Sequence, residues 1–217
     1  MSIFGTIADA NGGERFEASI TSGEFSTALG DLIAIFVGFS DSGTVAEFTD
    51  VAGNDYTPQA LFHNLNGGQF GQWYVCLSAT KASATNTATA TFSGGAQNNS
   101  IIWVYDTPIS GGTPELDGAV AQGAGSTGDF NTTGLDEIVF CVGYNQTGGN
   151  FTVDTDFTLD SDNFGTFGGA EHATFSSAQT GLDLSFDGSS NGITVAAIAF
   201  KAAPPAPPSK RRSRRSK

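Results

Sequence analysis

The stretch Asp31-Leu32-Ile33-Ala34-Ile35-Phe36-Val37-Gly38-Phe39-Ser40 is the strongest structural signal in this 217-residue sequence. Its apolar residues occupy both sets of alternating positions, so a strand built from it buries both of its faces. Its β-branched and aromatic side chains fit a pleated surface. We therefore predict a central β-strand over 31–40 that is covered, at least in part, on both sides.

Further strand-like runs recur along the chain and are separated by Gly, Asn and Asp turns. They span 16–21, 44–49, 72–79, 85–92, 100–105, 137–144, 151–159, 173–177, 182–186 and 193–201. No long 3.6-residue apolar stripe competes with them. The pattern predicts an all-β fold, a single two-sheet antiparallel β-sandwich that is jelly-roll-like or, alternatively, immunoglobulin-like. The Gly-rich segment 111–128 is predicted to be a loop, and 50–55 a turn.

The end of the sequence changes composition twice. We assign 1–201 to the sandwich domain, 202–208 to a Pro-rich spacer and 209–217 to a basic tail, which we expect to be disordered unless bound. The residues up to 200 contain two cations and all 22 acidic residues, a net charge of −20, whereas 201–217 carry +7. The body therefore repels nucleic acid, while the tail attracts acidic partners.

The cations of the tail are its candidate contact residues, namely Lys210, Arg211, Arg212, Arg214, Arg215 and Lys217. They suit nucleic-acid phosphates, or an acidic protein surface that includes a neighbouring copy of this chain. The third reading is a tail that only improves solubility. The strongly acidic body disfavours the nucleic-acid reading.

The sequence carries no recognisable catalytic motif: there is no phosphate-binding loop, no G-x-S-x-G elbow and no H-E-x-x-H. Of the two histidines, His172 is interpreted as a loop residue in a Gly-rich turn. We predict that Asp154 and Asp156 share one face of a strand and that Asp160 and Asp162 follow in a turn. Clustered carboxylates suit calcium, so these four are a candidate calcium site, with no other cofactor expected.

Aromatic and sulfur-containing residues lie inside the expected strands. Trp73, Tyr74, Trp103 and Tyr144 are candidates for stacking on sugars, although core packing is the preferred interpretation. Cys76 and Cys141 either form one disulfide between strands or stay as buried free thiols, and the thiols are preferred. The first residues lack a basic segment followed by an apolar run, so we expect no signal peptide.

Two stretches, 30–37 (GDLIAIFV) and 50–57 (DVAGNDYT), together resemble a recurrent β-sandwich module of phage structural proteins and of bacterial surface or secreted proteins. Later elements fit the module as well, at 87–92, 102–105, 116–117 and 197–201. The resemblance spans most of 28–201 and implies the fold. It brings no catalytic residue to this chain.

These observations favour a non-enzymatic virion structural protein, a capsid decoration or surface-exposed subunit assembled in the host cytoplasm. We expect its partners to be other virion proteins and neighbouring copies in a homo-oligomer, with nucleic acid contacted only through the tail and no membrane contact. The alternative is an extracellular carbohydrate-binding or adhesion module.

Overall fold

A computed structural model describes residues 4–5, 8–14, 17–40, 43–64, 68–97, 99–145, 154–164, 168–186 and 193–203, with only the backbone for 8–14, 64 and 162–164. Regular structure in this part of the chain is almost entirely β-strand, and the paired strands are antiparallel. The predicted all-β sandwich is confirmed. No helix among these residues has the length and apolarity needed to cross a membrane.

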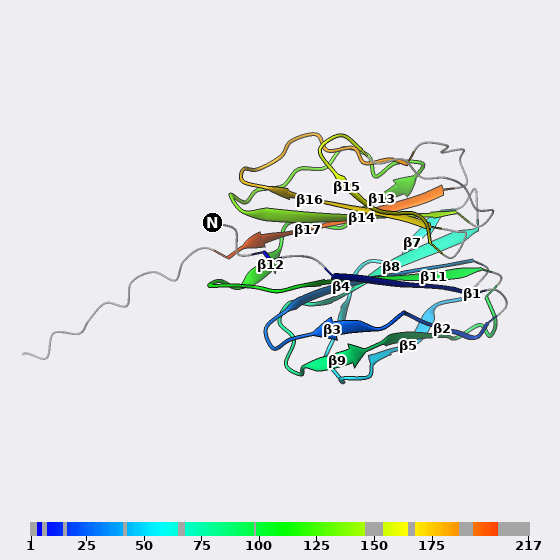
Figure 1. Ribbon diagram of the computed structural model, residues 1–217. Helices are drawn as coiled ribbons and strands as arrows, with labels where there is room; N and C mark the ends of the chain where they lie inside the picture. Colours follow the sequence, from blue (N-terminus) through cyan, green and yellow to red (C-terminus); the bar gives the residue numbers. More distant parts are fainter. Residues whose placement is uncertain are drawn as a thin grey trace, which may run out of the picture.

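The strands stack in three layers rather than the two sheets expected (Figure 1). The central sheet has the order β1 (Ala8–Glu14), β11 (Ser100–Thr107), β4 (Leu32–Ser40), β8 (Gln69–Cys76) and β6 (Thr57–Pro58), and β7 (Phe62–Asn64) also pairs with β8. The layer below it consists of two small sheets. One has the order β2 (Ser19–Thr21), β10 (Ala88–Phe92) and β5 (Val45–Asp50), and the other is the pair β3 (Phe25–Thr27) and β9 (Ser83–Asn86).

The upper layer is one sheet with the order β12 (Pro114–Leu116), β17 (Ile193–Ala202), β14 (Glu137–Asn145), β16 (Gly168–Phe175) and β15 (Thr158–Phe164). The short strand β13 (Ala121–Ala124) also pairs with β17. The layers are built in sequence order: described residues 8–107 supply the lower and central sheets, and 114–202 supply the upper one. The segment 108–113, which joins the central sheet to the upper one, lies at the end of the molecule where β17 ends, on the left in Figure 1.

Strand β4 is buried at all nine positions, as its sequence predicts. One face, with Leu32, Ala34 and Phe36, packs against the upper sheet. The other, which includes Ile33 and Ile35, packs against the lower sheet. Each fully buried large apolar side chain contributes roughly 1.5–3 kcal/mol, so the two-sided strand and its neighbours dominate the stability of the fold.

A third apolar cluster covers the outer face of the upper sheet. Val139 and Cys141 of β14 and Val195 of β17 lie there beneath Leu184 and Phe186. Both cysteines are free and buried. Cys76 belongs to the cluster below the central sheet and Cys141 to this outer cluster, so the preferred reading of two thiols is confirmed.

Three sequence predictions about strands were wrong. The strand expected at 182–186 is not formed, and Leu182 and Ser185 make only isolated bridges. Residues 154–157, expected within a strand, include a turn at Thr155 and Asp156, and Asp156 has a φ of 70°. The segment 111–128, expected to be a loop, contains β12 and β13. Both short strands pair with β17, so their structure depends on a partner about 80 residues away rather than on their own Gly-rich sequence.

Two glycines make room for aromatic rings between the central and upper sheets. Gly38 of β4 and Gly71 of β8 lie opposite each other in the register. A Cβ atom at Gly38 would lie 2.9 Å from a ring carbon of Tyr144, and one at Gly71 would lie 2.7 Å from Phe36. Any larger residue therefore displaces an aromatic ring from the core.

We expect Gly38→Ala and Gly71→Ala each to lower the free energy of unfolding by roughly 1–3 kcal/mol, because overpacking a dense core forces side chains off their preferred rotamers. Guanidinium chloride unfolding followed by tryptophan fluorescence measures this change. Ser19→Ala, on the exposed outer face of β2, is the control. Midpoints that match the wild type would show that the sheets can move apart at no cost.

Candidate functional site

The proposed contact residues of the basic tail, 210–217, lie outside the described residues, as does nearly all of the spacer. The structure does fix the point from which they follow. Strand β17 ends at Ala202, whose N–H donates to the Asp136 carbonyl (3.0 Å), and the Ala203 N–H donates to the Thr113 carbonyl (2.9 Å). The tail is therefore attached to a hydrogen-bonded end of the sandwich.

Several loops meet at this end, and hydrogen bonds join three of them. The Gly30 N–H donates to the Ala79 carbonyl (2.8 Å), and the Asn54 side chain accepts the N–H groups of Thr80 and Lys81. We call the loops 28–31, 51–55 and 77–81, together with the neighbouring segments 115–117, 134–136 and 201–203, the tail-bearing end. Hollows of about 410 Å³ and about 370 Å³ indent it, the first beside Leu77 and Leu116 and the second beside Leu135.

Lys201 is held by an acidic cluster at the tail-bearing end. Its Nζ atom lies 3.0 Å from Asp117 Oδ1 and 3.7 Å from Glu115 Oε1, and it donates to Thr133 Oγ1 (2.7 Å). Burial raises the pKa of Asp117, but hydrogen bonds from Thr133 and Lys201 outweigh it and hold the pKa at about 2. Burial and the nearby Asp117 raise the pKa of Glu137. The cluster fixes the end of β17.

The geometry expected for the calcium candidates is wrong. Asp154 and Asp156 do not share a strand face, and Asp160 and Asp162 belong to strand β15 rather than to a turn. Asp154 Oδ2 accepts the Ser185 N–H (2.7 Å), while Asp156 is exposed in its turn. The described side chains, which exclude Asp162, contain no group of three or more acidic, His or Cys residues placed to hold a metal ion. Calcium binding stays a prediction.

His172 lies in strand β16, not in the loop expected from its Gly-rich sequence. Its Nδ1 atom is 2.7 Å from Asp160 Oδ1, and the Tyr105 hydroxyl donates to Asp160 Oδ2 (2.9 Å). Glu171, which is fully buried next to it, accepts the Asp154 N–H (2.8 Å). Burial, together with Asp154 and Asp160, raises the pKa of Glu171 to about 8. Hydrogen bonds of these groups join β11, β15 and β16, which is a structural role.

A second buried carboxyl group ties the central sheet to the lower layer. Asp106, at the end of β11, accepts from the Thr27 hydroxyl (2.8 Å) and shares a hydrogen bond with Asp31. Burial and the neighbouring Asp31 raise the pKa of Asp106 to about 8. The Asn86 side chain continues the network from Thr27 to Asp50. Asp106 therefore holds a proton at neutral pH, and that proton is what permits two carboxyl groups to meet.

Asp50 is the centre of the predicted turn at 50–55, and the turn is confirmed. The Gly53 N–H donates to the Asp50 carbonyl (3.1 Å), and Gly53 has a φ of 79°. The Asp50 carboxylate accepts from the side chains of Asn54, Asn86 and Tyr56. Burial opposes its charge, but these donors prevail and lower the pKa of Asp50. The residues that carry the module resemblance thus build a turn.

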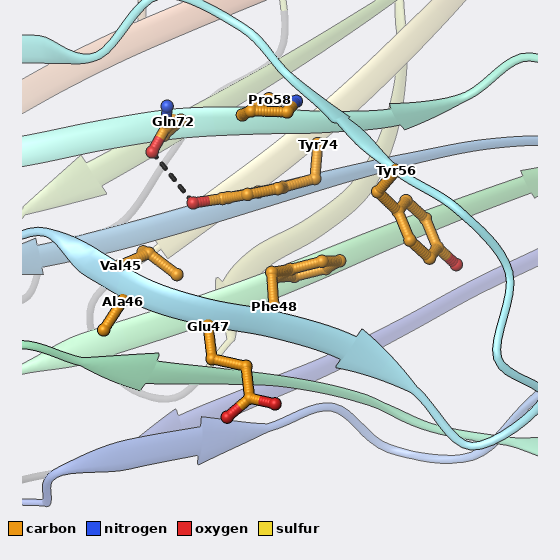
Figure 2. A pocket seen from close by; sticks show the side chains of 8 residues that line it. All are labelled: Val45, Ala46, Glu47, Phe48, Tyr56, Pro58, Gln72 and Tyr74. Carbon is orange, nitrogen blue, oxygen red and sulfur yellow. Dashed lines mark hydrogen bonds between the residues drawn. The ribbon is translucent and has the colours of Figure 1, made fainter.

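An aromatic pocket of about 300 Å³ opens beside this turn, between β5 and strands β6 and β8 (Figure 2). The rings of Phe48 and Tyr74 stack with their centroids 4.0 Å apart, and Tyr56 meets Phe48 edge-on at 5.1 Å. Figure 2 shows Phe48 and Val45 on the side of β5 that faces the pocket, with Glu47 directed away. β5 and β6 are edge strands, so the pocket lies where two sheets end together.

The polar groups of the aromatic pocket already have partners. The Tyr74 hydroxyl donates to Gln72 Oε1 (2.8 Å), Gln72 Nε2 donates to the Gln59 carbonyl (2.8 Å), and the Tyr56 hydroxyl donates to Asp50 (2.8 Å). Burial raises the pKa of both tyrosines, so they stay neutral donors. The pocket offers ring surfaces and oriented polar groups, which suit a partly apolar, uncharged ligand.

The four aromatic residues proposed for sugar stacking are core residues. Trp73, Trp103 and Tyr144 are fully buried, and Tyr74 is 5% exposed. Only Tyr74 reaches the aromatic pocket, so core packing, the preferred interpretation, is confirmed for the other three. Sequence reasoning missed Phe48 and Tyr56 as pocket residues, because their proximity depends on how two sheet edges meet.

No protein-family model, no curated protein and no solved structure matches this chain. The candidate sites therefore rest on their own geometry.

We expect Asp106→Asn to flatten the dependence of stability on pH. The aspartate pKa is about 3.9 in an unfolded chain, but about 8 in the folded one. Between these values the folded chain holds one proton more than the unfolded chain, so the free energy of unfolding falls as the pH rises. Glu171 adds a slope of the same sign.

Asparagine keeps the shape and the hydrogen bonds of protonated Asp106. At pH 9 the variant should therefore exceed the wild type by roughly 1–3 kcal/mol. Urea unfolding at pH 5, 7 and 9 measures the profile, with the exposed Asp183→Asn as control. A variant that is equally destabilised at all three values would contradict a proton on Asp106.

Proposed function

We propose that this chain is a non-enzymatic structural protein of a virus or phage particle, a capsid decoration or surface-exposed subunit that assembles in the host cytoplasm. The observation that carries this proposal is the separation of charge. Residues up to 200 have a net charge of −20, and the cations of 210–217 follow the hydrogen-bonded end of β17 after a short Pro-rich spacer. A stably packed acidic body with an attached basic tail suits an anchored subunit.

The partner of the tail follows from electrostatics. Tail cations attract any acidic surface, but the acidic body is repelled from nucleic acid within about 10 Å at moderate salt. The partners are therefore other virion proteins and neighbouring copies, with nucleic acid contacted through the tail alone. An uncharged spacer lets the tail reach its partner while the body stays outside.

The titratable groups support a role without catalysis. Glu171 and Asp106 are buried and joined to neighbouring strands, and His172 is paired with Asp160. The His172 ring is hydrogen-bonded to Asp160, so this imidazole is held by a carboxylate rather than aligned with a hydroxyl or a thiol. These groups hold layers together in the described part of the chain.

Co-sedimentation tests the structural role. Particles of the virus or phage that encodes this chain are purified, stripped of the protein and mixed with full-length chain or with a chain that ends at Ala203. We expect the full-length chain to pellet with particles at 50 mM salt and to be released at 0.5 M, because screening weakens exposed charge pairs. The truncated chain should stay in the supernatant.

The control is a chain with the spacer intact and its tail cations exchanged for glutamine, which should behave like the truncated chain. Circular dichroism confirms that each variant is folded. Equal binding of all three chains would show that the tail is not the anchor. No binding by any of them would remove the particle role.

The aromatic pocket favours a second function, binding of an uncharged glycan, as in an extracellular adhesion module. Phe48 and Tyr56 are partly exposed, and Gln72 supplies an amide at the same opening. Sugars present apolar C–H faces and hydroxyl edges, which such rings and amides match. The Phe48 and Tyr56 rings therefore supply the contact surface in this reading.

A glycan array probed with labelled full-length chain tests this second function. We expect saturable binding to a neutral glycan that weakens at least tenfold in Tyr56→Ala. Phe175→Ala, which removes a partly buried ring far from the pocket, is the matched control. An array without signal, or equal loss in both variants, would remove the glycan reading and leave the particle role untouched.

A further inference from the structure

The tail-bearing end gathers exposed apolar side chains. Leu29, Val51 and Leu135 project from separate loops and are 69%, 72% and 80% exposed, and Leu77 is 38% exposed. These four are among six large hydrophobic residues exposed in the described part of the chain; the other two are Leu61 and Leu159. A single exposed leucine is ordinary, but several at one end of a sandwich mark a contact surface.

The lysines of the described residues lie at the same end, which also carries five acidic residues, Asp31, Asp55, Glu115, Asp117 and Asp136. Lys81 and Lys201 are the cations among the described residues, and both belong to the tail-bearing end. The Lys81 Nζ atom donates to the Gly53 carbonyl (2.7 Å), which holds it between the loops that carry Val51 and Leu77. The tail cations follow from Ala203 at this end. Exposed acidic side chains occur on other faces, as at Glu17, Glu47 and Asp183.

We propose that the tail-bearing end docks on the acidic body of a second copy of this chain. In this contact the apolar tips Leu29, Val51 and Leu135 lose water against the neighbour, while the basic tail lies on its carboxylates. This inference deepens the proposed function, since it names the partner of the tail as a neighbouring copy.

Charge complementarity selects the second copy and the geometry of the contact. A body of −20 is the acidic surface that every copy supplies to the tail of another. Two basic tails repel each other, and 17 of the 22 acidic residues lie outside the sequence ranges of the tail-bearing end. The contact therefore joins two different faces, a tail-bearing end and a body. Such heterologous contacts form closed rings or continue as open chains.

Sedimentation velocity of the purified full-length chain from 1 to 200 µM tests this proposal. The monomer has a mass of 22.3 kDa. We expect the average mass to exceed twice that value at the highest concentration in 50 mM salt and to fall towards the monomer in 0.5 M salt. Screening weakens the contact between the tail and the carboxylates, so salt opposes this association.

Two variants separate the two parts of the contact. Leu29→Ser with Val51→Ser and Leu135→Ser removes the apolar tips, and exchange of all six tail cations for glutamine removes the charge. Each should weaken association at least tenfold. The matched control, Leu61→Ser with Leu159→Ser, changes exposed leucines elsewhere and should associate like the wild type. Thermal unfolding shows that each variant keeps its fold.

A chain that stays at 22.3 kDa throughout would overturn the proposal. Association that survives both the tip variant and the tail variant would also overturn it, because another face would then be responsible. Binding of the tail to anionic lipid vesicles or to duplex DNA by a chain that stays monomeric would assign the end to a different partner. The particle assay is separate, so a monomer that still pellets with particles leaves the proposed function in place.

Discussion

The structure depends on the burial of both faces of the central sheet. Because β4 is covered above and below, its neighbours need apolar residues at consecutive positions, and layers must lie on either side. Every carboxyl group near the interior must then either accept hydrogen bonds or hold a proton. The chain has few cations in its body, so it relies on hydrogen-bond donors for Asp50 and on bound protons for Asp106 and Glu171.

In the part of the chain that the structure describes, both lysines lie at one end of the molecule. A typical domain spreads lysines and arginines over its surface, where they pair with carboxylates at little net gain. Here the described lysines and the basic tail share one end, while the exposed faces elsewhere carry carboxylates and hydroxyls. The resulting polarity makes the two ends of the sandwich chemically different. It is the property on which both the proposed anchoring role and the proposed contact between copies rest.

Local sequence was enough to predict the elements that bury their own side chains. The strand at 31–40, the strands at 100–105, 137–144 and 193–201, and the turn at Asp50 follow from apolar runs and turn residues. The short strands β12 and β13 did not follow, because they form only by pairing with β17. Asp154 and Asp160 were misplaced for a similar reason, since alternation of residues cannot show where a strand stops. The aromatic pocket and the tail-bearing end come from tertiary contacts, which the sequence does not show. An apolar residue beside glycine, as in Leu29-Gly30 and Gly134-Leu135, is nevertheless a local signal for an exposed apolar side chain in a loop.

The order of the layers along the chain has a consequence during synthesis on the ribosome. The lower and central sheets are complete once residue 107 has emerged, but β17, which pairs with β12, β13 and β14, comes last in the body. Until then, the face that bears Trp73, Trp103 and Tyr105 waits uncovered in the nascent chain. The core between the central and upper sheets is therefore completed only when β17 arrives.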